Sequence, residues 1–431
     1  MWGLWVPGYH LTTLVIFVAT LLSVHRLLLR AAPSAGGAFA AAVGVIFIAL
    51  HPVHGEILPV AARRADLLAV LWMSTALTDQ LADPSRGRSR PLRAALWTAL
   101  ALLSKESALL LPGLLWIAAF VTAPATSAAF AASPAAKTPA AHLRDVFSRA
   151  LHALRAIVPS LAAAFAVLGI RLLLLGGIVG NRPMLESGLA TASVTMLARI
   201  LRASLDWEFR AGGVGTGSIA AVAFVIAYGA HSLLSRHADG GSDRWSAVGF
   251  IAPLLGLGWL IEAAVLFAKG LILPRWYIIN PVVALSLLLA AGMASSGPAP
   301  ADAAGRTARR GITAAALVLL VVTAAKSPVI RGLDSWHTAA RIQTDYLDLL
   351  AGKIEQAPKG SRIEMPRVPA MLPRKEGGSP IGGLAIMAGY SVKAWASLRY
   401  PDRRIRVEVG RAIKTPPGPD EVVVQLGALR S

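Results

Sequence analysis

Long apolar runs alternate along this chain with short gaps that are rich in arginine. The 431 residues are 55% hydrophobic, and the mean hydropathy is +0.60. A soluble domain keeps only its core dry, whereas every helix that crosses a bilayer needs about 20 apolar residues in a row. The pattern therefore predicts an all-α, multi-pass membrane domain.

About ten apolar segments have the length of membrane spans when short or kinked helices are counted. One of them, residues 95–120, is too long for a single helix that crosses once. It is interrupted by Ser104, Lys105 and Glu106, which favours two short helices that meet there. The candidate spans lie at about residues 9–24, 38–50, 65–83, 95–120 (two helices), 157–178, 219–234, 247–267, 276–293 and 312–325.

The positions of arginine and lysine predict the orientation of these spans. The basic gaps all fall on one side, taken as the cytoplasm, if the spans alternate and the 104–106 break is an outer turn. The outer side then receives residues 51–64, Lys105, residues 181–210, residues 269–275 and everything after Lys326. Met1 also falls outside, with no span or signal peptide before it, so we expect that a first span is missing from this sequence.

The net charge of +19 and the lack of cysteine limit the other classes of function. Most of the arginine lies in the gaps between apolar runs, so binding of nucleic acid is not expected. A chain without cysteine forms no disulfides and offers no thiolate for catalysis or metal binding. Neither a cofactor nor a metal is expected.

The last hundred residues differ in character from the rest. They are polar and rich in proline and glycine, with strand-like runs at residues 403–409 (RRIRVEV) and 420–426 (DEVVVQL). We expect residues 1–326 to form the membrane domain and residues 327–431 to form a small outer α+β domain.

Three motifs carry a resemblance to a known family: HPVHGE at residues 51–56, RADLL at 64–68 and LSKE at 103–106. In this order and spacing they resemble the membrane half of the transmembrane-and-tetratricopeptide O-mannosyltransferases and their bacterial relatives. Residues 169–177 (GIRLLLLGG) and 273–290 (LPRWYIINPVVALSLLLA) also resemble segments of that family. The resemblance covers about Gly8 to Met293.

That family belongs to the GT-C class of glycosyltransferases, which take a sugar from a polyprenyl phosphate. The resemblance implies a hexosyltransferase of the bacterial inner membrane that glycosylates a protein or glycan acceptor at the outer face, with its C-terminal domain in the periplasm. Mannose is the sugar that the family suggests, although no residue here predicts it. The family's first outer loop, which carries its presumed catalytic acids, and its 34-residue repeats have no counterpart in this chain.

Two other functions stay open. A non-catalytic membrane scaffold could keep the GT-C fold without the family's first loop. A transporter is disfavoured, because the sequence has no paired halves with matching broken helices.

The cluster between residues 51 and 66 supplies the first candidate site residues. Glu56 follows a span end and is the expected catalytic carboxylate, which would accept the proton of the acceptor hydroxyl; the alternative is a solvated loop residue. His51 and His54 are expected to line the cavity rather than bind metal, since the intervening proline disfavours a helix that presents both rings. Arg64 is expected to contact phosphate beside Asp66, the alternative being an ion pair or a helix cap.

Ionisable residues inside the apolar runs supply the others. Such groups cost at least a few kcal/mol in a membrane unless they are paired or hydrated. Lys105 is therefore expected to face the cavity and contact the lipid phosphate, with Glu106 beside it; the alternative is a structural Lys105–Glu106 pair. Arg171, within a span, and Arg275, at an outer span end, are expected to be further substrate-binding cations.

Overall fold

The structure is a computed structural model of the whole chain, and part of that chain can be described residue by residue. The described residues are 6–32, 37–51, 53–82, 90–123, 139–175, 196–197, 200–201, 204, 251–268, 278–294, 303–327, 334–365, 371–372, 384–385, 389–409 and 423–425. They belong to two compact units, Met1–Arg331 and Gly332–Ser431. The sequence-based boundary lies close by, after residue 326.

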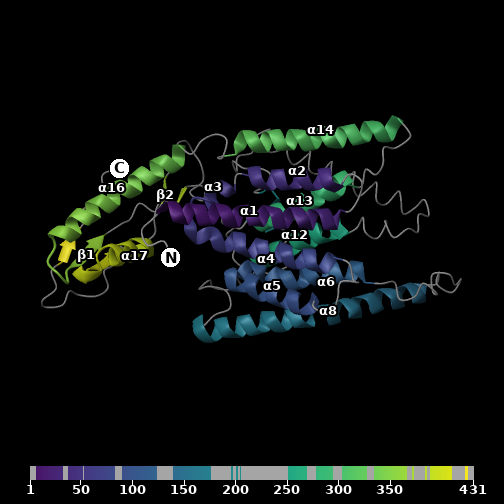
Figure 1. Ribbon diagram of the computed structural model, residues 1–431, viewed down its shortest axis with the longest axis horizontal. Coiled ribbons are helices and arrows are strands. Elements are labelled where there is room, and N and C mark those ends of the chain that lie inside the picture. Colours follow the sequence, from purple (N-terminus) through teal and green to yellow (C-terminus); the bar gives the residue numbers. More distant parts are fainter. Residues whose placement is uncertain are drawn as a thin grey trace. The chain divides into compact units, whose positions relative to one another are not determined.

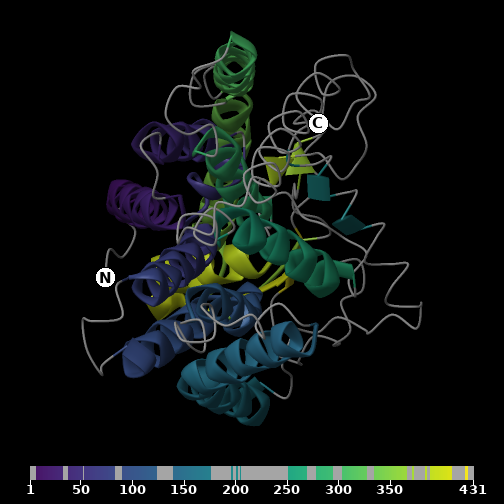
Figure 2. The same ribbon diagram turned by 90° about the vertical axis from the view of Figure 1, so that its right-hand side faces the viewer.

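The first unit is a bundle of helices that lie side by side (Figures 1 and 2). Its elements are α1 (Val6–Ala31), α2 (Gly37–Leu50), α3 (His54–Ile57), η1 (Ala61–Arg63), α4 (Arg64–Leu81), α5 (Arg90–Ser104), η3 (Glu106–Leu110), α6 (Leu111–Thr122), α8 (Pro139–Leu175), α12 (Ile251–Ala268), α13 (Ile279–Ala294) and α14 (Ala303–Lys326). The predicted break in the run 95–120 is confirmed, because α5 ends at Ser104 and η3 begins at Glu106.

Helix α13 lies in the middle of the bundle. It packs against α2 on one side and α12 on another, and all described side chains from 278 to 293 are buried. A helix that is apolar all round is expected to be covered on every side. Gly256 of α12 lies so close to Ala284 and Leu288 of α13 that a side chain there would clash with them, and small residues allow such close contact between helices.

Hydroxyl groups join α1 to α4. Thr20 donates a hydrogen bond to the Leu67 carbonyl oxygen at 3.2 Å, and the Ser23 and Thr75 hydroxyls are 2.9 Å apart. Further along, the rings of Trp72 on α4 and Trp97 on α5 stack with their centroids 5.4 Å apart. These contacts hold α4 between α1 and α5.

Among the described residues, two helical segments are long and apolar enough to cross a membrane: Pro7–Ala31 and Leu143–Leu174. Only 33% and 22% of their most apolar windows are buried, so apolar side chains such as Val15 and Phe165 lie on the outside of the bundle. A buried core helix or a signal sequence can pass the same length test. The helical class is confirmed, whereas the number of about ten spans stays a prediction, since the candidate at 219–234 lies outside the described residues.

The second unit combines helices with a small parallel sheet. Its elements are α16 (Asp334–Gln356), β1 (Arg362–Met365), β2 (Met371–Leu372), β3 (Leu384–Ala385), α17 (Gly389–Arg399), η7 (Pro401–Arg403), β4 (Arg406–Val409) and β5 (Val423–Gln425). The sheet order is β4-β1-β5, and both neighbours of β1 run parallel to it. Strands were expected where β4 and β5 lie, whereas β1 was not predicted. Strands β1 and β4 run parallel, and α17 lies between them in the chain. This is a parallel crossover, whereas α+β folds typically keep helices and strands in separate parts of the chain.

One face of this sheet forms the core of the unit. Ile363, Met365 and Val407 are buried together with Leu350 and Ile354 of α16. The neighbouring residues in each strand point to the opposite face, because side chains alternate along a strand. That face carries Arg362, which is fully buried and contacts Glu408 at 2.8 Å and Glu364 at 3.1 Å.

Candidate functional site

Lys105 is the one residue at which the chain leaves the helical conformation between α5 and η3. Its backbone is extended, with φ −155° and ψ 141°. Its N–H still bonds the Ala101 carbonyl oxygen at 2.9 Å, and its own carbonyl oxygen accepts from Ala108 at 3.1 Å. The backbone is thus hydrogen-bonded on both sides of the break.

The Lys105 ammonium lies 3.5 Å from the carboxylate of Asp66. Asp66 occupies the first turn of α4, where a negative charge is favoured by the helix dipole. Its side chain is fully buried, and neither carboxylate oxygen has a hydrogen-bond partner within the described part of the chain. Lys105 is therefore the ion-pair partner of Asp66 in the described structure, and the nearby Arg63 adds a weaker attraction.

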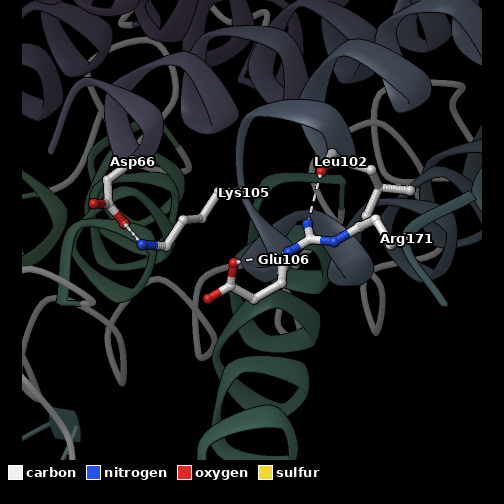
Figure 3. A network of polar contacts seen from close by, with 5 residues as sticks. All are labelled: Asp66, Leu102, Lys105, Glu106 and Arg171. Atoms are coloured by element: carbon white, nitrogen blue, oxygen red, sulfur yellow. Dashed lines mark hydrogen bonds and ion pairs between the residues drawn. The ribbon is translucent and has the colours of Figure 1, made fainter. Parts of the chain in front are cut away.

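Glu106 makes a second ion pair, with Arg171 near the end of α8. The two side chains are 3.8 Å apart, and Arg171 also donates a hydrogen bond to the Leu102 carbonyl oxygen at 3.3 Å. Figure 3 shows the two pairs on either side of the break between α5 and η3. Side chains from α4, α8 and the break itself thus meet in one polar network.

Lys105 and Glu106 each have an ion-pair partner on a different helix, Asp66 on α4 and Arg171 on α8. The direct Lys105–Glu106 pair that the sequence offered as an alternative stays a prediction. The network brings together four of the predicted site residues, Asp66, Lys105, Glu106 and Arg171. Their roles toward a substrate stay predictions.

Arg64 joins α4 to α1 rather than this network. Its guanidinium donates to the Thr13 hydroxyl at 2.9 Å and to the Tyr9 carbonyl oxygen at 2.7 Å, and it lies 5.1 Å from the centre of the Tyr9 ring. These contacts give Arg64 a structural role. Contact with phosphate stays a prediction for this residue.

His51 and His54 are buried at the end of α2. Val53 donates its N–H to His51 Nδ1 at 3.1 Å, so Nε2 carries the proton and donates to the Ser204 carbonyl oxygen at 3.0 Å. His54 Nε2 lies 2.7 Å from the Ile48 carbonyl oxygen and donates to it. Both rings are thus neutral and hold the turn after α2. Among the described residues, no group of three His, Cys, Asp or Glu side chains could hold a metal ion.

Acidification is expected to destabilise the helical unit, because the buried imidazole rings of His51 and His54 resist protonation. Burial lowers the pKa of His51 to about 3 and that of His54 to about 4, whereas an unfolded histidine titrates near about 6.5. Below that value the unfolded chain binds more protons than the native one, so stability falls as the pH falls. At pH 5 the loss is about 2 kcal/mol for each ring.

Thermal unfolding in detergent between pH 7.5 and pH 5 measures this effect. The His51→Gln variant should lose less stability than the unmodified protein over that range. Replacing the exposed His337 in the same way is the matched control. An equal loss in all three proteins would exclude His51 as a cause.

Two predicted residues cannot be placed in the site. The backbone of Glu56 belongs to α3, but its side chain lies outside the described part of the structure. Arg275 also lies outside the described residues. The catalytic role of Glu56 and the phosphate contact of Arg275 therefore stay predictions.

Glu262 of α12 was missed in the sequence. It is the only charged residue of that helix and lies against Gly113 at the start of α6, directly after η3. The cost of a charge inside an apolar run, which drew attention to Lys105, applies equally to Glu262. That argument would have found it.

Comparison with known proteins gives no match to any family model, to any curated protein or to any solved structure. The likeness to GT-C glycosyltransferases therefore depends on the motifs at residues 51–56, 64–68 and 103–106 and on the segments at 169–177 and 273–290.

Proposed function

We propose that the helical unit is a membrane glycosyltransferase that moves a sugar from a polyprenyl phosphate to an acceptor hydroxyl at the outer face of a bacterial inner membrane. The observation that carries the proposal is the polar network at the break between α5 and η3. Two cations and two carboxylates gather there from α4, α8 and the break itself. Ionisable groups are rare inside membrane bundles and mark substrate sites.

The chemistry needs a cation where the lipid phosphate leaves. When the bond to the sugar breaks, negative charge develops on the phosphate, and a positioned cation stabilises it. Lys105 lies 3.5 Å from Asp66. This ion pair holds the ammonium at the break, where it would stabilise the charge that develops on the phosphate.

Other parts of the proposal rest on sequence alone. Glu56 would accept the acceptor's proton, mannose is the sugar that the resemblance suggests, and the second unit would lie in the periplasm. The acceptor would be a protein or a glycan.

A non-catalytic scaffold is the second candidate, and one observation favours it. Lys105 and Arg171 each already have a carboxylate partner. Two internally compensated ion pairs could simply fix the helices in place, and transfer activity separates the two candidates.

Binding of a polyprenyl phosphate tests the phosphate role of Lys105. The variant Asp66→Asn with Lys105→Met removes both charges together, so it leaves no uncompensated carboxylate. Its affinity for the lipid should fall on the order of tenfold or more, because one charge-assisted hydrogen bond contributes about 1.5–3 kcal/mol. Equilibrium binding in detergent micelles measures the change.

The matched control is Asp79→Asn, a carboxylate in the last turns of the same α4 helix. It should bind the lipid as the unmodified protein does. Equal affinities in the double variant and the control would remove Lys105 from the phosphate site. Lipid binding without any transfer of sugar would favour the scaffold.

A further inference from the structure

Glu262 has no ion-pair partner in the part of the chain that the structure describes. The rest of α12 is uncharged, and Glu262 has no hydrogen bond to Oε2 among the described residues. A polar group that is withdrawn from water without a partner is costly. The packing of α12 therefore does not explain why an ionisable residue occupies position 262.

The contacts of α12 place Glu262 at the same end of the bundle as the Lys105 network. Glu262 lies against Gly113 of α6, and Gly258 lies against Ile117 one turn further along α6. The two helices are thus antiparallel, and Glu262 lies beside the first turn of α6. Helix η3, which starts at Glu106, leads directly into that turn and also contacts α12.

The charged neighbours of Glu262 on the elements that pack against it are few. Helices α6 and α13 carry no ionisable side chain, and η3 carries only Glu106, which pairs with Arg171. Lys105, just before η3, pairs with Asp66. Helix α1 makes a minor contact with α12 and carries Tyr9, two histidines and two arginines.

Gly113 makes room for the carboxylate. A Cβ atom at this position would overlap the end of the Glu262 side chain. The Glu262 carboxylate is flexible, so a methyl group at 113 would displace it without forcing the two backbones apart. The pair thus offers two independent ways to disturb the carboxylate, by changing its charge or by moving it.

The charge of Glu262 decides which part of a lipid-linked sugar it could contact. A carboxylate repels phosphate but accepts hydrogen bonds from hydroxyl groups, and a sugar attached to a phosphate at Lys105 would lie next to that phosphate. We propose that Glu262 accepts a hydrogen bond from a hydroxyl group of the donor sugar. This inference rests on the proposed function and adds to it the residue that distinguishes a glycosylated donor from a bare polyprenyl phosphate.

The experiment compares two lipids, polyprenyl phosphate and mannosyl-phosphoryl polyprenol, in equilibrium binding to the detergent-solubilised protein. Glu262→Gln keeps the shape of the side chain and removes its charge. It should weaken binding of the mannosylated lipid on the order of tenfold, the loss expected for one charge-assisted hydrogen bond. It should change the affinity for polyprenyl phosphate, which has no sugar, by less than about twofold. Gly113→Ala should shift the ratio of the two affinities in the same direction, and Asp79→Asn should not shift it.

The outcomes separate the two proposals. If the unmodified protein binds both lipids and neither Glu262→Gln nor Gly113→Ala changes the ratio of affinities, Glu262 does not contact the sugar, while the proposed function stands. An equal loss for both lipids would also overturn the inference, because it indicates a general change in the bundle. If the unmodified protein binds neither lipid, both proposals are wrong.

Discussion

Lys105→Met is expected to destabilise the helical unit by about 3–5 kcal/mol, because it leaves a buried carboxylate without its cation. Asp66 is fully buried and has Lys105 as its one ion-pair partner among the described residues. Methionine keeps the length and apolar stem of the lysine, so packing around the break should change little. Thermal unfolding in detergent micelles measures the loss.

Two further variants show whether the buried charge is the cause. Adding Asp66→Asn to Lys105→Met removes the uncompensated carboxylate and should restore most of the lost stability. Arg93→Met breaks the pair with Asp79, in which the arginine side chain is 46% exposed, and should cost less than about 1 kcal/mol. The explanation fails if Lys105→Met is as mild as Arg93→Met, or if Asp66→Asn brings no recovery.

The second large effect is expected in the C-terminal unit, where Arg362→Leu should cost about 3–5 kcal/mol. Glu364 of β1 and Glu408 of β4 are direct neighbours across the sheet, and like charges in that position repel. The buried guanidinium of Arg362 lies within 3.1 Å of one and 2.8 Å of the other. Without it, two carboxylates face each other with no cation between them.

Hydrogen exchange followed by mass spectrometry over residues 334–409 measures this loss in the intact protein. Faster exchange in β1 and β4 is expected for Arg362→Leu. Arg406→Leu is the matched control, because Arg406 lies opposite Arg362 on β4 and is exposed. Adding Glu364→Gln and Glu408→Gln to Arg362→Leu should restore protection. Unchanged exchange in Arg362→Leu would mean that the cation contributes little.

Local signals in the sequence were enough to predict the break at Lys105, because three polar residues interrupt an apolar run. They were not enough to predict its partners. The pairing of Lys105 with Asp66 depends on how α4 packs beside α5. The spacing of residues within either helix does not predict which helices pack together. The partner of Glu106 is 65 positions away along the chain, as the ion pair with Arg171 shows.

Two omissions have different causes. Glu262 was overlooked although the argument used for Lys105 applied to it. Strand β1 was overlooked because its four residues, Arg-Ile-Glu-Met, look like polar loop sequence. Their alternation is nonetheless that of a strand with one apolar face, and the charges of the other face are tolerated because Arg362 compensates Glu364 and Glu408.

The distribution of charge along α8 has a consequence for the lipid around it. Its 37 residues extend about 55 Å at 1.5 Å per residue, whereas the hydrocarbon layer of a bilayer is about 30 Å thick. Residues 139–155 carry Arg144, Arg149 and Arg155, whereas residues 156–175 carry Arg171 alone. If residues 156–175 cross the hydrocarbon layer, the first part of the same helix extends about 25 Å beyond it. Its arginines would then lie at the level of the lipid headgroups and in the water beyond them, where anionic phosphates attract them. One side of the bundle would therefore gather anionic lipids around the first half of α8.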